Sequence, residues 1–138
     1  MTDFYFENVR ILLAEDHPIN AEIATEILTL KGMRVELAGD GAEAVKCFEQ
    51  SASGYFDLIL MDMRMPNMDG LEATKAIRAS GHPDAAKIPV IALTANSFQE
   101  DKDMAKEAGM NDFLSKPLEI DLLYTVIQKW LTEFNTNL

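Results

Sequence analysis

The chain has 138 residues, of which 48% are hydrophobic and 25% are charged, a balance typical of one globular domain. Its 23 acidic and 12 basic residues leave a net charge of −11, which argues against binding to nucleic acid or to an anionic membrane. The one cysteine, Cys47, excludes an intrachain disulfide, and no apolar run approaches the ~20 residues that span a bilayer. Because the N-terminus also lacks the basic segment of a signal peptide, we expect a cytoplasmic location, either as a free domain or as the cytoplasmic part of a membrane-bound protein.

The first two predicted elements are a strand at residues 9–14 and a helix that begins near Pro18 and ends at Gly32. Proline is favoured in the first turn of a helix, and glycine is favoured just after the last turn. Three apolar residues at helical spacing are expected to form the buried face of this helix: Ile23, Ile27 and Leu30.

The alternation of strand and helix continues along the chain. Further strands are predicted at residues 33–38, 58–61, 88–93 and 113–114. A helix follows each strand, and Asp40 with Glu43, and Ser97 with Glu100, have the spacing of helix caps. Five strand-plus-helix repeats predict an α/β fold with a parallel sheet covered on both faces. We expect residues 1–8 to be an extension or linker, 9–132 the domain, and 133–138 a tail.

Polar side chains gather where the predicted strands end. The first strand is followed by Glu15 and Asp16, the third by Asp62, the fourth by Thr94 and the fifth by Lys116. The carboxyl ends of parallel strands share one edge of the sheet, and ligands bind outside that edge. Three carboxylates, a hydroxyl and an ammonium group are therefore expected to converge.

The methionines near Asp62 do not indicate a cofactor site. Met61 is expected in the core, and Met63, Met65 and Met68 are expected in a loop.

Three carboxylates so close together repel one another unless a cation lies between them, and one lysine is insufficient for three acids. Oxygen ligands without histidine or cysteine favour Mg²⁺, with Mn²⁺ as a substitute. A divalent metal beside a lysine and a threonine suits phosphoryl oxygens, and an aspartate at such a site can become an aspartyl phosphate. Helix capping remains the alternative for Asp62, and loop positions remain the alternative for Glu15 and Asp16.

These motifs resemble those of the receiver domain of two-component response regulators, most closely the receivers at the C-terminus of hybrid sensor histidine kinases. The resemblance covers about residues 8–132 and rests on four segments in order: LLAED at 12–16, LILMDMRMPNMDG at 58–70, ALTA at 92–95 and SKP at 115–117. It implies a flavodoxin-like, doubly wound, five-stranded parallel sheet of order 2-1-3-4-5 with five helices.

The resemblance also implies a function for each matching residue. Asp62 is the phosphoacceptor, and Mg²⁺ is held by Glu15, Asp16, Asp62 and the backbone carbonyl of Arg64. The residues expected to bind the phosphoryl group are Thr94, Ala95 and Lys116. Phe113 is expected to switch together with Thr94, although a half-buried core aromatic is an equal reading of it. Two further expectations are a cis peptide bond at Lys116–Pro117 and a dephosphorylation rate tuned by Arg64 and Asn96.

By the same resemblance, the partners are a histidine kinase domain, a histidine phosphotransfer protein, or both, and the chain is a monomer or weak dimer. It is not expected to be a classical enzyme, because it catalyses only its own phosphorylation and dephosphorylation. A stand-alone response regulator is the alternative to a hybrid kinase. Two other classes of protein fit less well. A haloacid-dehalogenase-type phosphatase has a second acid two residues after its nucleophile, where this chain has Arg64. A flavodoxin-like cofactor module has a phosphate-binding loop where this chain has acids.

Overall fold

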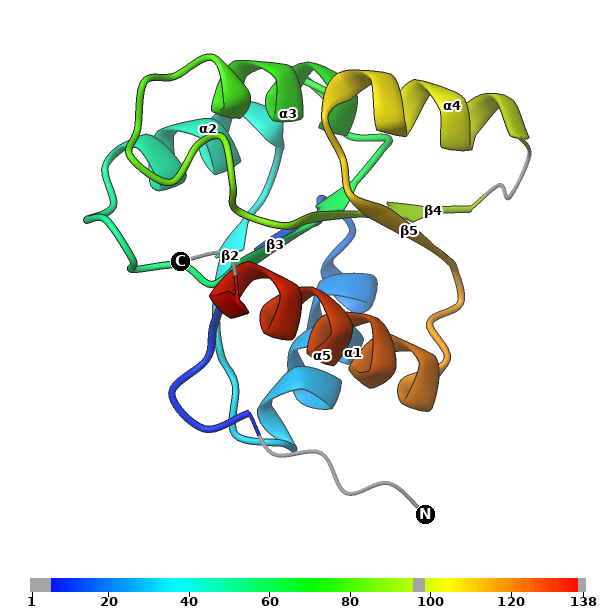
Figure 1. Cartoon of the computed structure of the whole chain (residues 1–138). Helices are drawn as coiled ribbons and strands as arrows, with labels where there is room; N and C mark the ends of the chain where they lie inside the picture. Colours follow the sequence, from blue (N-terminus) through cyan, green and yellow to red (C-terminus); the bar gives the residue numbers. More distant parts are fainter. Residues whose placement is uncertain (1–5, 96–98, 137–138) are drawn as a thin grey trace.

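The computed structural model describes residues 6–95 and 99–136 (Figure 1). Its centre is one parallel sheet of five strands in the order β2-β1-β3-β4-β5. The strands are β1 (Arg10–Ala14), β2 (Arg34–Ala38), β3 (Leu58–Asp62), β4 (Val90–Thr94) and β5 (Asp112–Ser115). The predicted fold class, strand order and number of helices are confirmed.

Two layers of helices cover the sheet. The helices are α1 (Pro18–Thr29), α2 (Gly41–Glu49), α3 (Gly70–Arg78), α4 (Gln99–Ala108) and α5 (Ile120–Thr136). In Figure 1, α1 and α5 lie together below the sheet, and α2, α3 and α4 lie above it. Two separate clusters of buried side chains correspond to these two layers. This arrangement leaves the ends of the central strands uncovered by helices.

The central strand β3 is buried over all five of its residues. Successive side chains of a strand point to opposite faces, so β3 contributes to both hydrophobic clusters. Leu58 and Leu60 join the cluster between the sheet and helices α1 and α5, whereas Ile59 and Met61 join the cluster on the other face. Asp62 therefore ends a strand that is apolar because helices cover both of its sides.

Two helices begin with aspartate caps, of which the one at Asp40 was predicted. Asp40 accepts a hydrogen bond from the amide of Glu43 at 2.8 Å, and the Glu43 carboxylate accepts one from the amide of Gly39 at 3.1 Å. Asp69 caps α3 in the same way, through the amide of Glu72 at 2.8 Å. Asp69 is thus a helix-capping residue. The predicted cap at Ser97 lies outside the described residues.

Helix α1 buries a different face from the predicted one. Only Ile27 of the three predicted residues is buried, whereas Ile23 is 49% exposed and Leu30 is 75% exposed. The buried face consists of Ala21, Ala24, Ile27 and Leu28. The small side chains of Ala21 and Ala24 let α1 approach the sheet closely, and Ile23 lies on the outer side of the helix.

Met63 and Phe6 are both buried in the structure. Met63 lies in the loop after β3, as expected, yet it is 2% exposed and belongs to the core on the side of α2 and α3. Phe6, which precedes the predicted domain start, is 5% exposed, and its ring centroid lies 6.1 Å from that of Tyr124 in α5. The division into extension, domain and tail stays a prediction.

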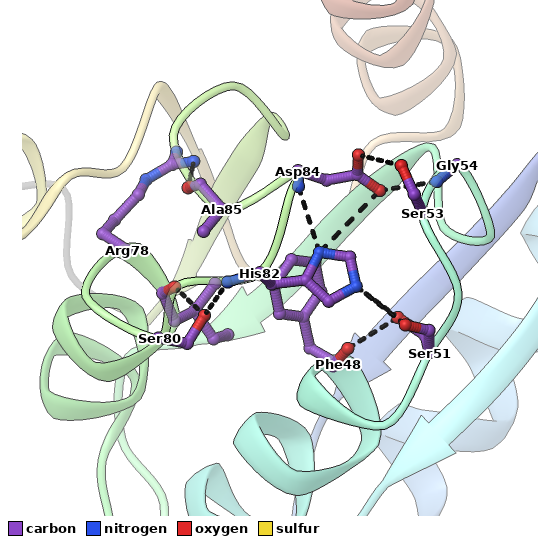
Figure 2. Close-up of polar contacts among 10 residues, drawn as sticks. Phe48, Ser51, Ser53, Gly54, Arg78, Ser80, His82, Asp84 and Ala85 are labelled. Carbon is purple, nitrogen blue, oxygen red and sulfur yellow. Dashed lines mark hydrogen bonds and ion pairs between the residues drawn. The ribbon is translucent and has the colours of Figure 1, made fainter.

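At the end of the sheet where β4 begins, the side chain of His82 lies between two loops and is 5% exposed (Figure 2). Its ring packs against that of Phe48 at an angle of 43° with centroids 4.4 Å apart, and its Nε2 lies 2.8 Å from the carbonyl oxygen of Ser51. Its Nδ1 accepts a hydrogen bond from the amide of Asp84 at 3.0 Å. The imidazole thus joins the loop before β3 to the loop before β4, far from the carboxyl ends of the strands.

Candidate functional site

The polar residues at the strand ends meet at one edge of the sheet. Because β1 and β3 are neighbours in the sheet, Glu15 and Asp62 lie side by side. β4 follows β3, and β5 follows β4, which brings Thr94 and Lys116 to the same edge. The amide of Lys116 donates to the carbonyl of Thr94 at 2.7 Å and extends the pairing of these last two strands.

Lys116 joins two buried carboxylates. Its Nζ lies 2.5 Å from Oε1 of Glu15 and 2.9 Å from Oδ2 of Asp62. The side chains of Glu15 and Asp62 are only 2% and 7% exposed. Burial raises the pKa of Glu15, with a further rise from hydrogen bonding to Asp62 and a partial offset by Lys116. Burial acts to lower the pKa of Lys116, but the two carboxylates outweigh it and the pKa is raised.

This geometry predicts the effect of Lys116→Ala on stability. We expect the free energy of unfolding at pH 7 without metal to fall by about 2 kcal/mol, because two buried carboxylates lose their counter-charge. The loss should shrink as the pH falls toward about 4.3, the ordinary pKa of a glutamate, because protonation of Glu15 relieves the repulsion. Denaturant titrations from pH 7 to pH 4.5 measure both effects. The exposed Lys87→Ala is the control, and an equal loss in both variants would contradict the assignment.

Three carboxylates at this edge form a cluster that fits a hard cation. One oxygen from each of Glu15, Asp16 and Asp62 lies within 4.8 Å of the others, and Asp16 is the exposed member. Like charges at this distance repel, and Lys116 neutralises only one of them. The donor set contains oxygen alone, which suits Mg²⁺ rather than a metal that prefers nitrogen or sulfur.

The loop after β3 is folded tightly against Asp62. The amide of Arg64 donates to Oδ1 of Asp62 at 3.1 Å, and the amide of Gly70 donates to the carbonyl of Met63 at 3.1 Å. A Cβ atom on Gly70 would lie 2.1 Å from the carbonyl oxygen of Asp62, so only glycine fits there. The start of α3 therefore fixes the backbone of Asp62, and the backbone of Arg64 fixes its carboxylate.

Four other predicted residues, Thr94, Ala95, Phe113 and Pro117, lie in or shortly after β4 and β5. Thr94 is 3% exposed at the end of β4, and Ala95 follows it. Phe113 in β5 is partly buried, and Nζ of Lys102 lies 4.9 Å from its ring centroid. The Lys116–Pro117 peptide bond is cis. Asn96 lies outside the described residues, so its predicted effect on dephosphorylation stays a prediction.

A cavity of about 410 Å³ adjoins the site and was not anticipated. Its lining combines Glu15 and Lys116 with residues of α1 and of the segment after β5, among them Ile23, Pro117 and Leu118. The alanines at positions 21 and 24 are the signal that could have revealed it, because they mark the packed face of α1 and leave Ile23 outside. Within the described residues, no helix is long and apolar enough to cross a membrane.

Comparison with known proteins gives a consistent result. Residues 11–128 match the family model of the response regulator receiver domain. Hybrid signal transduction histidine kinase M of Dictyostelium discoideum is 45% identical over 120 residues, which cover 86% of this chain and 5% of the kinase. The chain spans only 5% to 7% of the length of this kinase and two further Dictyostelium hybrid histidine kinases that it matches.

Solved structures with the same fold include two informative ones. The receiver domain of the sensor histidine kinase PA1611 from Pseudomonas aeruginosa, with a magnesium ion coordinated in its active site cleft, has a TM-score of 0.81 and 41% identity, covering 90% of this chain and 98% of that one. The receiver domain of the response regulator Ssk1 from Saccharomyces cerevisiae, in complex with the histidine phosphotransfer protein Ypd1, has a TM-score of 0.78 and 33% identity, covering 91% and 90%.

Proposed function

The chain belongs to the response regulator receiver family, and we propose that its Asp62 accepts a phosphoryl group from a phosphorylated histidine of a partner protein. One observation carries the proposal: the Asp62 carboxylate contacts the ammonium group of Lys116 at 2.9 Å and lies within 4.8 Å of oxygens of two more acids, Glu15 and Asp16. A carboxylate so placed contacts a cation and belongs to a metal-binding group, which is the arrangement that phosphoryl transfer to an aspartate requires.

The proposed reaction is a direct transfer between two nucleophiles. A carboxylate oxygen of Asp62 attacks the phosphorus, the new P–O bond forms as the P–N bond of phosphohistidine breaks, and the electron pair returns to the imidazole nitrogen. Lys116 then exchanges its contact with the Asp62 carboxylate for a phosphoryl oxygen, and the Thr94 hydroxyl and the Ala95 amide donate to the other oxygens. Reversal of the reaction passes the group to another histidine, and attack by water releases phosphate.

The acidic cluster fits Mg²⁺, with Mn²⁺ as a substitute. Asp16 and Asp62 would hold the ion directly, Glu15 mainly through water, and Arg64 through its backbone carbonyl. When bound, the ion neutralises the carboxylates and the negative charge of the phosphoryl oxygens. The fit of the donor set, with oxygens from three acids within 4.8 Å, supports this assignment.

Phe113 is proposed to turn inward together with Thr94 when Asp62 is phosphorylated. Its ring is only partly buried, and it lines a surface hollow together with Lys102, so the ring has space in which to turn. The hydroxyl of Thr94 and the ring of Phe113 then move as a pair, because the phosphoryl group draws the hydroxyl toward Asp62. This conformational change, or onward transfer of the group, is the output that we assign to the domain.

The test is labelling of the purified chain with a radioactive small-molecule donor, acetyl phosphate, in the presence of Mg²⁺. We expect close to one phosphoryl group per chain, bound as an acid-stable, base-labile acyl phosphate. Sustained turnover of an unrelated phosphate ester without stoichiometric labelling would instead favour a phosphatase of the haloacid-dehalogenase type. Family membership and the receiver fold support the first outcome.

We further propose that the parent protein is a hybrid sensor histidine kinase and that the receiver works in the cytoplasm as a monomer or weak dimer. The similarity to receiver segments of hybrid kinases supports this over a stand-alone response regulator. Its partners are then a histidine kinase domain and a histidine phosphotransfer domain. No contact with nucleic acid or membrane is proposed for a chain with a net charge of −11.

The phosphotransfer partner is proposed to dock over the start of α1. A donor histidine must reach Asp62, so its helix has to lie on the surface beside the site. There Ile19 is 62% exposed and Ile23 is 49% exposed, and Ile23 lines the cavity that also contains Glu15 and Lys116. An apolar surface continuous with the reactive carboxylate suits the apolar face of a partner helix.

Ile23→Asp tests this docking surface. We expect transfer from a phosphorylated histidine phosphotransfer domain to slow about 10-fold, because a buried charge replaces an apolar contact. Labelling by acetyl phosphate should stay within about 2-fold of the parent, because that donor needs no docking surface. Leu30→Asp is the matched control, since Leu30 is 75% exposed and directly follows the last residue of α1. Equal slowing of both reactions, or by both variants, would refute this docking position.

A further inference from the structure

Asp101, in the first turn of α4, is a buried carboxylate outside the cluster described above. It is 7% exposed, and the other carboxyl groups that are buried within the described residues are Glu15 and Asp62. The helix N-terminus favours a negative charge at this position, but a carboxylate removed from water also needs a counter-charge. That counter-charge is Arg64, whose Nη2 lies 3.8 Å from Oδ1 of Asp101.

Arg64 therefore contacts two parts of the molecule at once. Its backbone amide donates to Oδ1 of Asp62, and its guanidinium group reaches α4. The side chain of Arg64 is 73% exposed, whereas that of Asp101 is 9% exposed. The arginine is thus the movable member of the ion pair and the aspartate is the fixed one. An exposed guanidinium two residues from Asp62 can turn toward a new anion at little cost.

We infer that Asp101 is a positioning residue that holds the Arg64 guanidinium on α4 and that a phosphoryl group on Asp62 competes with it for this guanidinium. The inference rests on the proposed function. A phosphoryl group brings a charge of about −1.5 to −2 and three acceptor oxygens to the site, more than one carboxylate offers. Guanidinium groups bind such oxygens in a fork of two hydrogen bonds. Phosphorylation would then remove the contact that secures the first turn of α4.

Amide hydrogen exchange in α4 tests the competition directly. In the parent with Mg²⁺, we expect labelling of Asp62 by acetyl phosphate to lower the protection of the α4 amides about 3-fold, as expected for loss of one partly exposed ion pair. In Arg64→Gln, the protection should already be low and should not change on labelling. Arg34→Gln, an exposed site with the same change of charge, should behave as the parent does.

A second measurement separates positioning from a structural contribution of Asp101 to α4. The half-life of the aspartyl phosphate in Asp101→Asn should differ about 3-fold from that in the parent, because the released guanidinium moves onto the phosphoryl oxygens. In the Arg64→Gln background, Asp101→Asn should have no further effect. Asp103→Asn, on the exposed side of the same helix, is the matched control.

The outcomes are distinguishable. The same change of half-life with and without Arg64 would show that Asp101 acts only through the helix and would overturn the inference, as would α4 protection that is insensitive to labelling in the parent. If the parent takes no label at all, the proposed function itself fails. Labelling with an unchanged α4 leaves the function standing and removes only the coupling.

Discussion

Asp62→Asn should abolish phosphoryl labelling of the chain. The carboxamide has no nucleophilic oxygen anion, and the neighbouring acids cannot replace it, because Glu15 is paired with Lys116 and Asp16 lies at the exposed rim. We expect incorporation from acetyl phosphate or from a phosphohistidine donor to drop from about one group per chain to background. Quantitative autoradiography of the two proteins under identical conditions measures it.

Asp69→Asn is the matched control for this substitution. It makes the same chemical change seven residues along the chain, where the side chain accepts a hydrogen bond from the amide of Glu72 and caps α3. Asparagine caps helices as well as aspartate does, so both folding and labelling should be retained. Full labelling of Asp62→Asn at another residue would show that the phosphoacceptor is assigned wrongly.

Stability without metal offers a second check on Asp62. Removing one of three clustered carboxylates relieves repulsion, while Lys116 keeps its contact with Glu15. We therefore expect Asp62→Asn to unfold at an equal or higher denaturant concentration than the parent when Mg²⁺ is absent, with a gain on the order of 1 kcal/mol. Mg²⁺ should stabilise the parent more than the variant, because the ion can bind three carboxylates in the parent and only two in the variant.

The sequence predicted the strand ends well, because a topological rule links them. Alternating strands and helices imply a parallel sheet, a parallel sheet has one carboxyl edge, and so residues as distant as Glu15 and Lys116 had to meet there. The contact between them spans 101 positions of the chain and measures 2.5 Å. No local feature of either residue predicts this contact; the strand order 2-1-3-4-5, which the family resemblance implied, brings the two residues close together.

The faces of the helices were harder to predict. Helical spacing indicated an apolar face on α1 but could not show that alanines, rather than Ile23 and Leu30, lie against the sheet. The distance at which the helix packs on the sheet decides that choice, and a sequence pattern does not contain this distance.

The contact between Arg64 and Asp101 was missed for a related reason. Arg64 was singled out for its place two residues after Asp62, whereas Asp101 was not singled out, and only the position of α4 relative to the loop after β3 brings them together.

Arg78, at the end of α3, was not singled out in the sequence, although it is the cation with the most hydrogen bonds in the described part of the chain. Its guanidinium donates to the carbonyl oxygens of Ala85 and Ile88 at 2.9 and 2.7 Å. It also donates to the carbonyl of Gly109 at 2.8 and 3.1 Å and to Oδ1 of Asn111 at 2.8 Å. Figure 2 shows its contact with Ala85 beside the His82 cluster. Arg78 thus joins α3, the loop before β4 and the loop before β5.

Arg78→Ala should therefore be one of the most destabilising single changes in this chain. Burial lowers the pKa of Arg78, yet the group stays charged because its ordinary pKa is so high. Its removal leaves three backbone carbonyls without their donor, and we expect the free energy of unfolding to fall by about 3 kcal/mol. Lysine cannot reproduce the fork of donors, so Arg78→Lys should recover only a small part of this loss.

Denaturant unfolding of both variants, beside the exposed Lys75→Ala on the same helix, measures the effect. A loss below about 1 kcal/mol for Arg78→Ala would mean that water replaces the guanidinium without cost. The folded fraction of Arg78→Ala should still accept label at Asp62, because Arg78 acts on the loops that enter β4 and β5, whereas Asp62 lies where the strands end. The two substitutions thus distinguish the carboxyl ends of the strands, where we propose that the phosphoryl group binds, from the opposite ends, where Arg78 joins the loops that enter β4 and β5.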